Sequence, residues 1–185
     1  MDDIVKQAMQ KWPNVPDCYG WLGRDVRGHW WLRDAAAQAQ GAFPQSKGWR
    51  LEHAGWIAFI ERNYAADAHG CWFFQNGPQR VYVELESVPQ VWRVQPDGIL
   101  TTTAGVGVAP PQDCWMDEQG LLYLLCADVL GVVASADMLE AAQLLEQGRW
   151  PALQEVSAQA LPSLGGFVRS PQALVQAQAQ GMSGG

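Results

Sequence analysis

The amino-acid sequence predicts an α+β fold in which antiparallel hairpins and sheets are each packed with a helix, in two structurally related halves. One phrase occurs three times, as "DVRGHWWL", "DAHGCWFF" and "DEQGLLYL". It reads Asp-x-x-Gly-x, then an apolar residue, an aromatic residue and Leu or Phe. A hairpin followed by a helix is also predicted twice. We therefore expect a leading helix and loop, two α+β repeats and a C-terminal extension, at residues 1–18, 19–94, 95–148 and 149–185.

The first half opens with an amphipathic helix that Pro13 ends. The aromatic flanks of "GRDVRG" favour strands and its Asp and Gly favour a turn, so we expect a β-hairpin over Tyr19–Arg33. Asp34 then caps a short Ala-rich helix that stops at a glycine. The segment Leu51–Asn63 has apolar residues around most of its helical circumference, which predicts a largely buried helix.

The next hairpin is centred on Asn76-Gly77, with strict alternation along its return strand "RVYVELE". "QVWRVQPDGILTTT" predicts a further strand, turn and strand. Cys114–Cys126 predicts another hairpin, followed by the strand "GVVA". A helix capped by Ser135 is expected over Ala136–Gln147, and "SPQALVQAQAQ" predicts a short helix near the C-terminus.

Turn chemistry explains the repeated phrase. An Asp side chain accepts hydrogen bonds from backbone N–H groups just ahead of it, and glycine adopts positive φ without steric cost. The aromatic residue that follows begins the return strand into the core. We therefore interpret the three Asp-x-x-Gly units as hairpin turns in preference to repeated ligand sites.

The charge of the chain is unevenly distributed. The protein has 12 Lys and Arg against 19 Asp and Glu, a net charge of −7. Residues 1–93 are neutral, whereas residues 94–185 hold nine acidic residues and two arginines. Nucleic acids and anionic membranes require a basic face, so we expect neither as a partner.

The N-terminus and the cysteines favour a cytoplasmic location. "MDDIVKQAMQKW" starts with acidic residues and lacks the apolar core of a secretory signal. No segment reaches the roughly 20 apolar residues of a membrane span. The cysteines form no C-x-x-C pair, so we expect reduced, mostly buried thiols; they are Cys18, Cys71, Cys114 and Cys126.

Five pieces of the chain, in this order, form a recognisable pattern between about Tyr19 and Gly148: "DVRGHWWL", "GCWFFQNGPQRVYVELESVP", "DGILTTTAG", "DCWMDEQGLLYL" and "ADMLEAAQLLEQG". The pattern resembles an uncharacterised proteobacterial family of unknown function, of about this length and built of two α+β repeats. The resemblance implies two repeats side by side and a link to signalling. It brings no catalytic residues, so none are assigned to this chain.

Standard catalytic and nucleotide-binding signatures are absent from the sequence: it contains no G-x-x-x-x-G-K-[ST], H-E-x-x-H or G-x-S-x-G. His69 and Cys71 flank a glycine, but a metal site needs three or four converging ligands, so we expect neither a metal nor a cofactor. Glu84 and Glu86 lie on one strand face, about 7 Å apart by strand rise. Such a pair could act as acid and base on a glycosidic bond, but a solvated strand face is the simpler interpretation.

The segment "WFFQNGPQR" is the candidate ligand site. It combines aromatic rings, amides and a guanidinium; the candidate residues are Trp72, Phe74, Gln75, Asn76 and Arg80. An aromatic floor beside amides and one cation suits a small polar or anionic ligand. The alternative is an ordinary Asn-Gly hairpin with core aromatics and a surface arginine.

Trp30 and Trp31 form a candidate interaction site. Adjacent strand residues face opposite sides, so one indole should enter the core and the other is exposed unless the chain itself covers it. An exposed tryptophan is a common anchor of protein interfaces.

These features favour a non-catalytic cytosolic protein that binds a ligand or has a regulatory role, with an unknown small molecule or protein as its partner. We leave open whether it is an enzyme, although the missing signatures argue against it. One alternative is an enzyme of unrecognised type, with a site between the two halves that uses Arg80, Glu84 or Glu86. Another is a structural subunit whose surplus tryptophans form a homodimer interface.

Overall fold

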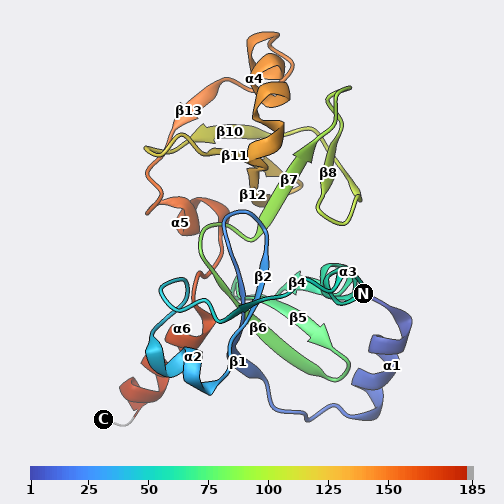
Figure 1. Cartoon of the computed structure of the whole chain (residues 1–185), viewed down its shortest axis with the longest axis vertical. Helices are drawn as coiled ribbons and strands as arrows, with labels where there is room; N and C mark the ends of the chain where they lie inside the picture. Colours follow the sequence, from blue (N-terminus) through green and yellow to red (C-terminus); the bar gives the residue numbers. More distant parts are fainter. Residues whose placement is uncertain (183–185) are drawn as a thin grey trace. The chain divides into compact units, whose positions relative to one another are not determined.

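A computed structural model of the protein describes residues 1–182 of the chain. It confirms the α+β fold, with two similar halves that each contain a β-sheet (Figure 1). Contacts within the chain define two compact units. Unit 1 comprises Met1–Asp25, His29–Glu86 and Val168–Gly185, and unit 2 comprises Val26–Gly28 and Ser87–Phe167.

Unit 1 contains a six-stranded sheet in the order β3-β2-β1-β6-β5-β4. Its strands are β1 (Cys18–Arg24), β2 (Trp30–Leu32), β3 (Trp49–Arg50), β4 (Tyr64–Ala66), β5 (Trp72–Asn76) and β6 (Gln79–Leu85). Its helices are α1 (Asp3–Lys11), α2 (Ala35–Gln40), α3 (Ala54–Arg62) and α6 (Pro171–Met182). The hairpins β1–β2 and β5–β6 and these helices lie close to their predicted positions, and the Asp34 carboxylate caps α2 by accepting the Ala37 N–H at 2.8 Å. The expected burial of α3 is wrong, because Ile60 is its one buried residue and Trp56 is 54% exposed.

Unit 2 contains a seven-stranded sheet in the order β13-β10-β11-β12-β7-β8-β9. Its strands are β7 (Gln90–Val94), β8 (Leu100–Thr102), β9 (Gly107–Val108), β10 (Asp113–Met116), β11 (Leu122–Cys126), β12 (Val129–Val133) and β13 (Leu153–Glu155). Its helical segments are η1 (Ser135–Asp137), α4 (Met138–Glu146) and α5 (Leu161–Gly165). The β7–β8 and β10–β11 hairpins confirm the predicted elements of this half.

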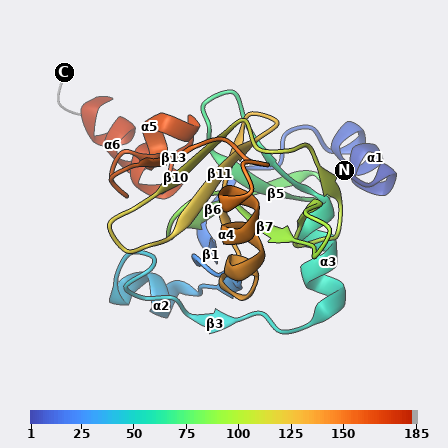
Figure 2. The same cartoon turned by 90° about the horizontal axis from the view of Figure 1, so that it is seen from above.

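Helix α4 packs on the sheet of unit 2, and Figure 2 shows it lying across the strands. The buried core that the helix and the sheet form together contains Trp92, Val94, Leu100, Cys114, Leu122, Leu124, Cys126, Val133, Ala141, Leu144 and Trp150. The Trp92 indole N–H donates to the Leu124 carbonyl at 3.0 Å, so this large side chain is buried with its polar atom satisfied.

The start of α4 differs from the prediction that Ser135 caps it. Ser135 lies inside the 3₁₀ turn η1, and no side chain caps either helical segment. Asp137 instead binds back to β7, where its carboxylate accepts the Val94 N–H at 3.0 Å and the Arg93 guanidinium at 2.6 and 3.0 Å. The hydrogen bond from Arg93 holds the pKa of Asp137 below its ordinary value.

Both sheets are mixed, whereas the sequence pattern led us to expect antiparallel pairing. Three pairs run parallel: β1 with β6, β7 with β12, and β10 with β13. A parallel pair needs a long crossover, and in each case the chain between the two strands contains whole hairpins or helices. Local patterns identify hairpins but carry no signal for these distant pairings.

The boundaries between the two units, as defined by contacts, differ from the predicted boundaries between the repeats. Strand β7 pairs with β8 and β12, so residues 90–94 belong to unit 2 although we expected the first repeat to extend to residue 94. The predicted extension, residues 149–185, is split between the units. Its last part returns to unit 1, where the Val168 N–H donates to the Gly70 carbonyl at 2.9 Å. Residues 183–185 of this extension lie outside the described residues.

The three Asp-x-x-Gly units are hairpin turns with a common hydrogen-bond pattern, as predicted. In each, one carboxylate oxygen accepts the backbone N–H four residues ahead, at 2.8–2.9 Å; the pairs are Asp25 with His29, Asp67 with Cys71, and Asp117 with Leu121. The other oxygen accepts from an aromatic side chain at 2.8–3.1 Å; these donors are the Trp31 indole and the hydroxyls of Tyr82 and Tyr123. The fourth position has φ between +77° and +83°, at Gly28, Gly70 and Gly120, which favours glycine.

We predict that Asp117→Ala lowers the free energy of unfolding by about 3 kcal/mol, because it removes the acceptor of two backbone N–H groups and the 2.8 Å hydrogen bond from the buried Tyr123 hydroxyl. Urea unfolding followed by circular dichroism measures the loss. The matched control is Asp97→Ala in the same unit. Its carboxylate accepts only the exposed Ile99 N–H in the described structure, so the expected loss is about 1 kcal/mol. Equal losses in the two variants would contradict this account of the turn.

Candidate functional site

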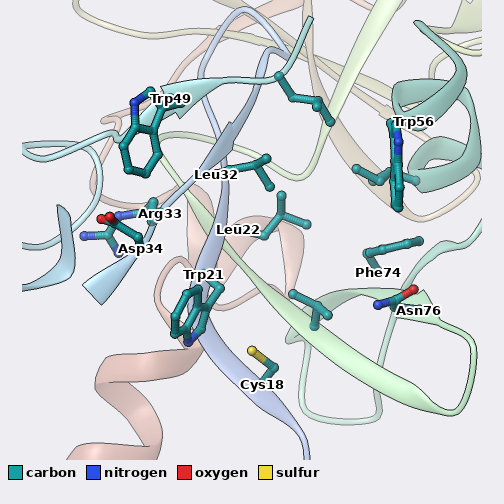
Figure 3. A pocket seen from close by; sticks show the side chains of 13 residues that line it. Cys18, Trp21, Leu22, Leu32, Arg33, Asp34, Trp49, Trp56, Phe74 and Asn76 are labelled. Carbon is teal, nitrogen blue, oxygen red and sulfur yellow. The ribbon is translucent and has the colours of Figure 1, made fainter. Parts of the chain in front are cut away.

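A groove of about 570 Å³ lies in unit 1 and is lined mainly by apolar side chains (Figure 3). Leu22 and Leu32 lie near its centre, with Trp49 and Trp21 on one side and Trp56 on the other. These three indoles project from β1, β3 and α3 and are 48%, 60% and 54% exposed for Trp21, Trp49 and Trp56. About half of each of these large residues is therefore left unburied by the chain.

Local backbone geometry brings several residues of β1 into this groove. The β1–β6 register shifts between Cys18 and Leu22, and Gly20 within this segment has φ of +78°. As a result Cys18, Trp21 and Leu22 all line the groove. The positive φ favours glycine at this position, and a side chain there would also displace the end of the Gln172 side chain.

The polar groups of the groove are largely occupied. Arg33 is 2% exposed, and its guanidinium donates to the carbonyls of Ser46 at 2.9 Å, Gly20 at 3.1 Å and Gly41. Burial lowers the pKa of Arg33, and the charge of Glu84 opposes this effect. The guanidinium thus links strand β1 to the segments at Gly41 and Ser46 and has little capacity left for a ligand.

The sequence-predicted ligand residues are divided between the two faces of the sheet. Phe74 and Asn76 line the groove. Gln75 and Arg80 are paired across β5 and β6 and lie on the other face, where the Arg80 guanidinium is 4.7 Å from the centre of the Phe73 ring. Alternation along the strand causes this separation. Ligand binding by Phe74 and Asn76 stays a prediction, but the guanidinium is not beside them.

Trp72 shares the strand face of Phe74 but not its position at the groove. It is 9% exposed and packs against Tyr64, with 4.7 Å between the ring centres. Gln75 is buried, and its amide nitrogen donates to the Gly77 carbonyl at 2.9 Å within the hairpin turn. Trp72 thus packs β5 against β4, and Gln75 stabilises the β5–β6 turn.

Of the two candidate interaction residues, Trp30 enters the core and Trp31 is half-buried. Trp30 is 1% exposed, its indole N–H donates to Glu61 at 2.9 Å, and Glu61 also pairs with the buried Arg24 at 3.2 Å. The Trp31 indole binds the Asp25 carboxylate at 3.0 Å. Both indoles are therefore satisfied inside unit 1, and an interaction through Trp31 stays a prediction.

The three groove tryptophans were not identified from the sequence. They share one signal: Gly-Trp occurs three times in the chain, and each occurrence supplies a groove indole, at Trp21, Trp49 and Trp56. Gly20 and Gly48 have positive φ, which bends the chain just before the indole. Strand and helix periodicity cannot identify residues that are turned outward in this way.

Glu84 and Glu86 have separate structural roles. Glu84 is 2% exposed and its carboxylate accepts the Gln172 N–H at 3.1 Å, at the N-terminus of α6. Burial raises the pKa of Glu84, although hydrogen bonds from Ser170 and Gln172 and the charge of Arg33 oppose the shift. Glu86 pairs with Lys47 at 2.8 Å. The expectation of a solvated strand face is therefore wrong for Glu84, which is buried at the end of a helix, and Glu86 is bound by a lysine.

Cys18 differs from the other cysteines in being only half-buried. All four thiols are free, and Cys71, Cys114 and Cys126 are buried. Burial raises the pKa of the Cys18 thiol and raises that of Cys71 and Cys114 to about 11. Among residues 1–182, no group of three or more His, Cys, Asp and Glu side chains is placed to hold a metal ion.

We predict that Glu84→Gln removes a pH dependence of stability. Since the folded-state pKa of Glu84 lies above its ordinary value of 4.5, the folded protein holds more protons than the unfolded chain between 4.5 and the raised pKa. Its contribution to the free energy of unfolding therefore falls as the pH rises through this interval. Urea unfolding at a series of pH values measures it, with Glu86→Gln as the matched control. Identical pH slopes in the wild type and Glu84→Gln would refute the assignment.

We predict that one thiol per native chain reacts with Ellman's reagent, and that it is Cys18. The raised pKa keeps the thiol mostly protonated at neutral pH, so the reaction should be slow at pH 7 and accelerate as the pH rises. Cys18→Ser should abolish this phase, and the remaining thiols should react only after unfolding. Persistence of the native phase in Cys18→Ser would show that another cysteine is accessible.

Comparisons with known proteins place the chain in a family and give no activity. No helix in the part of the chain that the structure describes is long and apolar enough to cross a membrane. No curated protein matches the chain. Among solved structures, a DUF1285 family protein from Silicibacter pomeroyi DSS-3 is similar, with 12% sequence identity, a TM-score of 0.48, and coverage of 74% of this chain and 75% of that one. The model of the DUF2944 family, described as "Protein of unknown function (DUF2946)", matches residues 1–172, and the chain therefore belongs to this family.

Proposed function

We propose that the protein is a non-catalytic binding protein and that the groove of unit 1 holds a small, mainly apolar molecule. The observation that carries this proposal is the convergence of three exposed indoles on one apolar groove. Its volume lies in the usual range of ligand pockets, which are lined mostly by apolar and aromatic side chains with a few polar groups. Soluble proteins seldom leave such a contiguous apolar surface exposed without a binding role.

The groove walls support binding without a large rearrangement. Leu22 and Ile60 are buried at 2% and 3% exposure, so the deeper wall is already packed. The indole N–H groups of Trp21, Trp49 and Trp56 have no hydrogen-bond partner among the described residues, so they remain free to meet a ligand's acceptor. A ligand would cover apolar rings that now face water, and each stacked ring would contribute on the order of 1 kcal/mol.

The groove also lacks an activated nucleophile, which supports a binding role over a catalytic one. Cys18 is the thiol at the groove, and burial raises its pKa, so the reactive thiolate is disfavoured. The guanidinium of Arg33 is held by backbone carbonyls, as described above. Glu84 and Glu86, which a catalytic reading would use, are engaged by α6 and Lys47.

In the same proposal the protein has a regulatory role, and binding of the ligand in the groove is the signal that it transmits. The protein would act in the bacterial cytoplasm. Four free cysteines, three of them buried, fit a reducing environment. The regulatory role follows from the resemblance noted in the sequence, and the groove supplies the binding event on which such a role would depend.

We predict that the protein binds N-phenyl-1-naphthylamine, a neutral dye whose emission rises in apolar surroundings, and that Trp49→Ala weakens this binding about tenfold. Trp49 is 60% exposed, so its removal should leave the core intact. The matched control is Trp12→Ala, which removes an indole that is 51% exposed in the same unit but does not line the groove. Dye titration measures the affinity, and circular dichroism checks the fold of each variant.

Equal affinities in the wild type and Trp49→Ala would overturn the proposal. The titration also tests the alternative that the indoles contact a second copy of the chain. In that case dye binding would weaken as protein concentration rises, because a dimer would cover the groove. Affinity that is independent of protein concentration is expected for a ligand site on the monomer.

A further inference from the structure

A second cavity adjoins the groove and differs from it in chemistry. This cavity, of about 470 Å³, lies between α2 and the segment that leads to β3. Polar side chains supply much of its lining; they are Gln40, Gln45, Ser46 and Lys47. Asp34 and Trp49 line both the groove and this polar cavity. The two residues therefore mark the junction of an apolar compartment with a polar one.

The Asp34 carboxylate at this junction forms no ion pair within the described residues. One of its oxygens accepts the Ala37 N–H at 2.8 Å. The neighbouring cations are engaged elsewhere. Lys47 pairs with Glu86 at 2.8 Å, and the Arg33 guanidinium donates to backbone carbonyls. A bound cation would therefore not have to displace an existing partner of Asp34.

The aromatic side chain at the junction favours the same sign of charge. Figure 3 shows Trp49 and Asp34 on the same side of the groove. The face of an indole attracts cations, and a cationic nitrogen near a carboxylate and an indole gains from attraction to both, whether or not it carries an N–H. An anionic head group would instead meet the like charge of Asp34, while Arg33 and Lys47, the cations lining the two cavities, are already bound by carbonyls and Glu86. A neutral hydroxyl could donate to Asp34 but would gain no attraction between opposite charges.

We propose that the ligand is an organic amine with an apolar body: its ammonium group lies at Asp34 beside Trp49, and its body fills the groove. This inference rests on the proposed binding function and adds the charge of the ligand to it. The polar cavity provides amide and hydroxyl groups for substituents near the ammonium. The apolar groove provides the affinity, and the junction provides the selection between amines and other amphiphiles.

The test compares three compounds with the same eight-carbon chain: octyltrimethylammonium, octanol and octanoate. Each competes with N-phenyl-1-naphthylamine for the wild-type protein, below the concentration at which it forms micelles. Octyltrimethylammonium should bind about fivefold more tightly than octanol, and octanoate should bind most weakly. The preference should shrink at high ionic strength, because salt screens a partly exposed charge.

Asp34→Asn isolates the carboxylate. Asparagine caps helices as well as aspartate does, so α2 should remain capped and the fold unchanged. The variant should lose the preference for octyltrimethylammonium over octanol. The matched control is Asp3→Asn, which removes one negative charge from unit 1 at an exposed position that pairs with Lys6. This control should keep the full preference.

The outcomes separate the two proposals. If octanol and the dye bind but the three head groups bind equally, the amine inference is overturned and the apolar groove stands. The same conclusion follows if Asp34→Asn retains the cation preference. If neither the dye nor any octyl compound binds, the proposed function itself is wrong. If the wild type and Asp3→Asn prefer the cation and Asp34→Asn does not, the result supports both the binding function and the amine inference.

Discussion

The parallel pairing of β1 with β6 is the constraint on which unit 1 depends. These two strands lie at the centre of the sheet, although about sixty residues separate them in the chain. One face of the pair carries Leu22 and Val81 toward the groove. The other carries Glu84 toward the first turn of α6. A one-residue slip between them would move Val81 away from the groove and turn the Glu84 carboxylate away from the helix.

Local sequence patterns predict the elements of this fold better than their assembly. Turn residues and alternation identify the hairpins because their two strands are adjacent in sequence, and the Asp34 cap and Pro171 identify helix starts for the same reason. The parallel pairs, the return of residues 168–182 to unit 1 and the division of the chain at residue 86 depend on contacts between distant segments. No local pattern encodes those contacts, so the sequence could not predict them.

The same distinction explains what the sequence missed at the groove. The segment "WFFQNGPQR" was selected for its chemistry, but a strand places alternate residues on opposite faces, so Phe74 lies at the groove and Arg80 does not. The groove itself combines residues from β1, β2, β3, β5, β6 and α3. Its clearest sequence signal is the Gly-Trp pair at Trp21, Trp49 and Trp56. The pair does not by itself predict a common site, because the three indoles meet only in the folded structure.

The Asp-x-x-Gly turns also bear on the order of folding. Each carboxylate closes a ring with an N–H only four residues ahead, and in two of the three turns its aromatic donor is just six residues away, at Trp31 and Tyr123. Closing so short a loop costs little chain entropy, whereas the β1–β6 pair requires ordering of a long intervening segment. The hairpins can therefore form early as local nuclei, and the rate of folding is expected to depend on the later docking of distant strands. Because the residues that line the groove are not among the carboxylate contacts of these turns, a substitution in the groove leaves the contacts that start assembly in place.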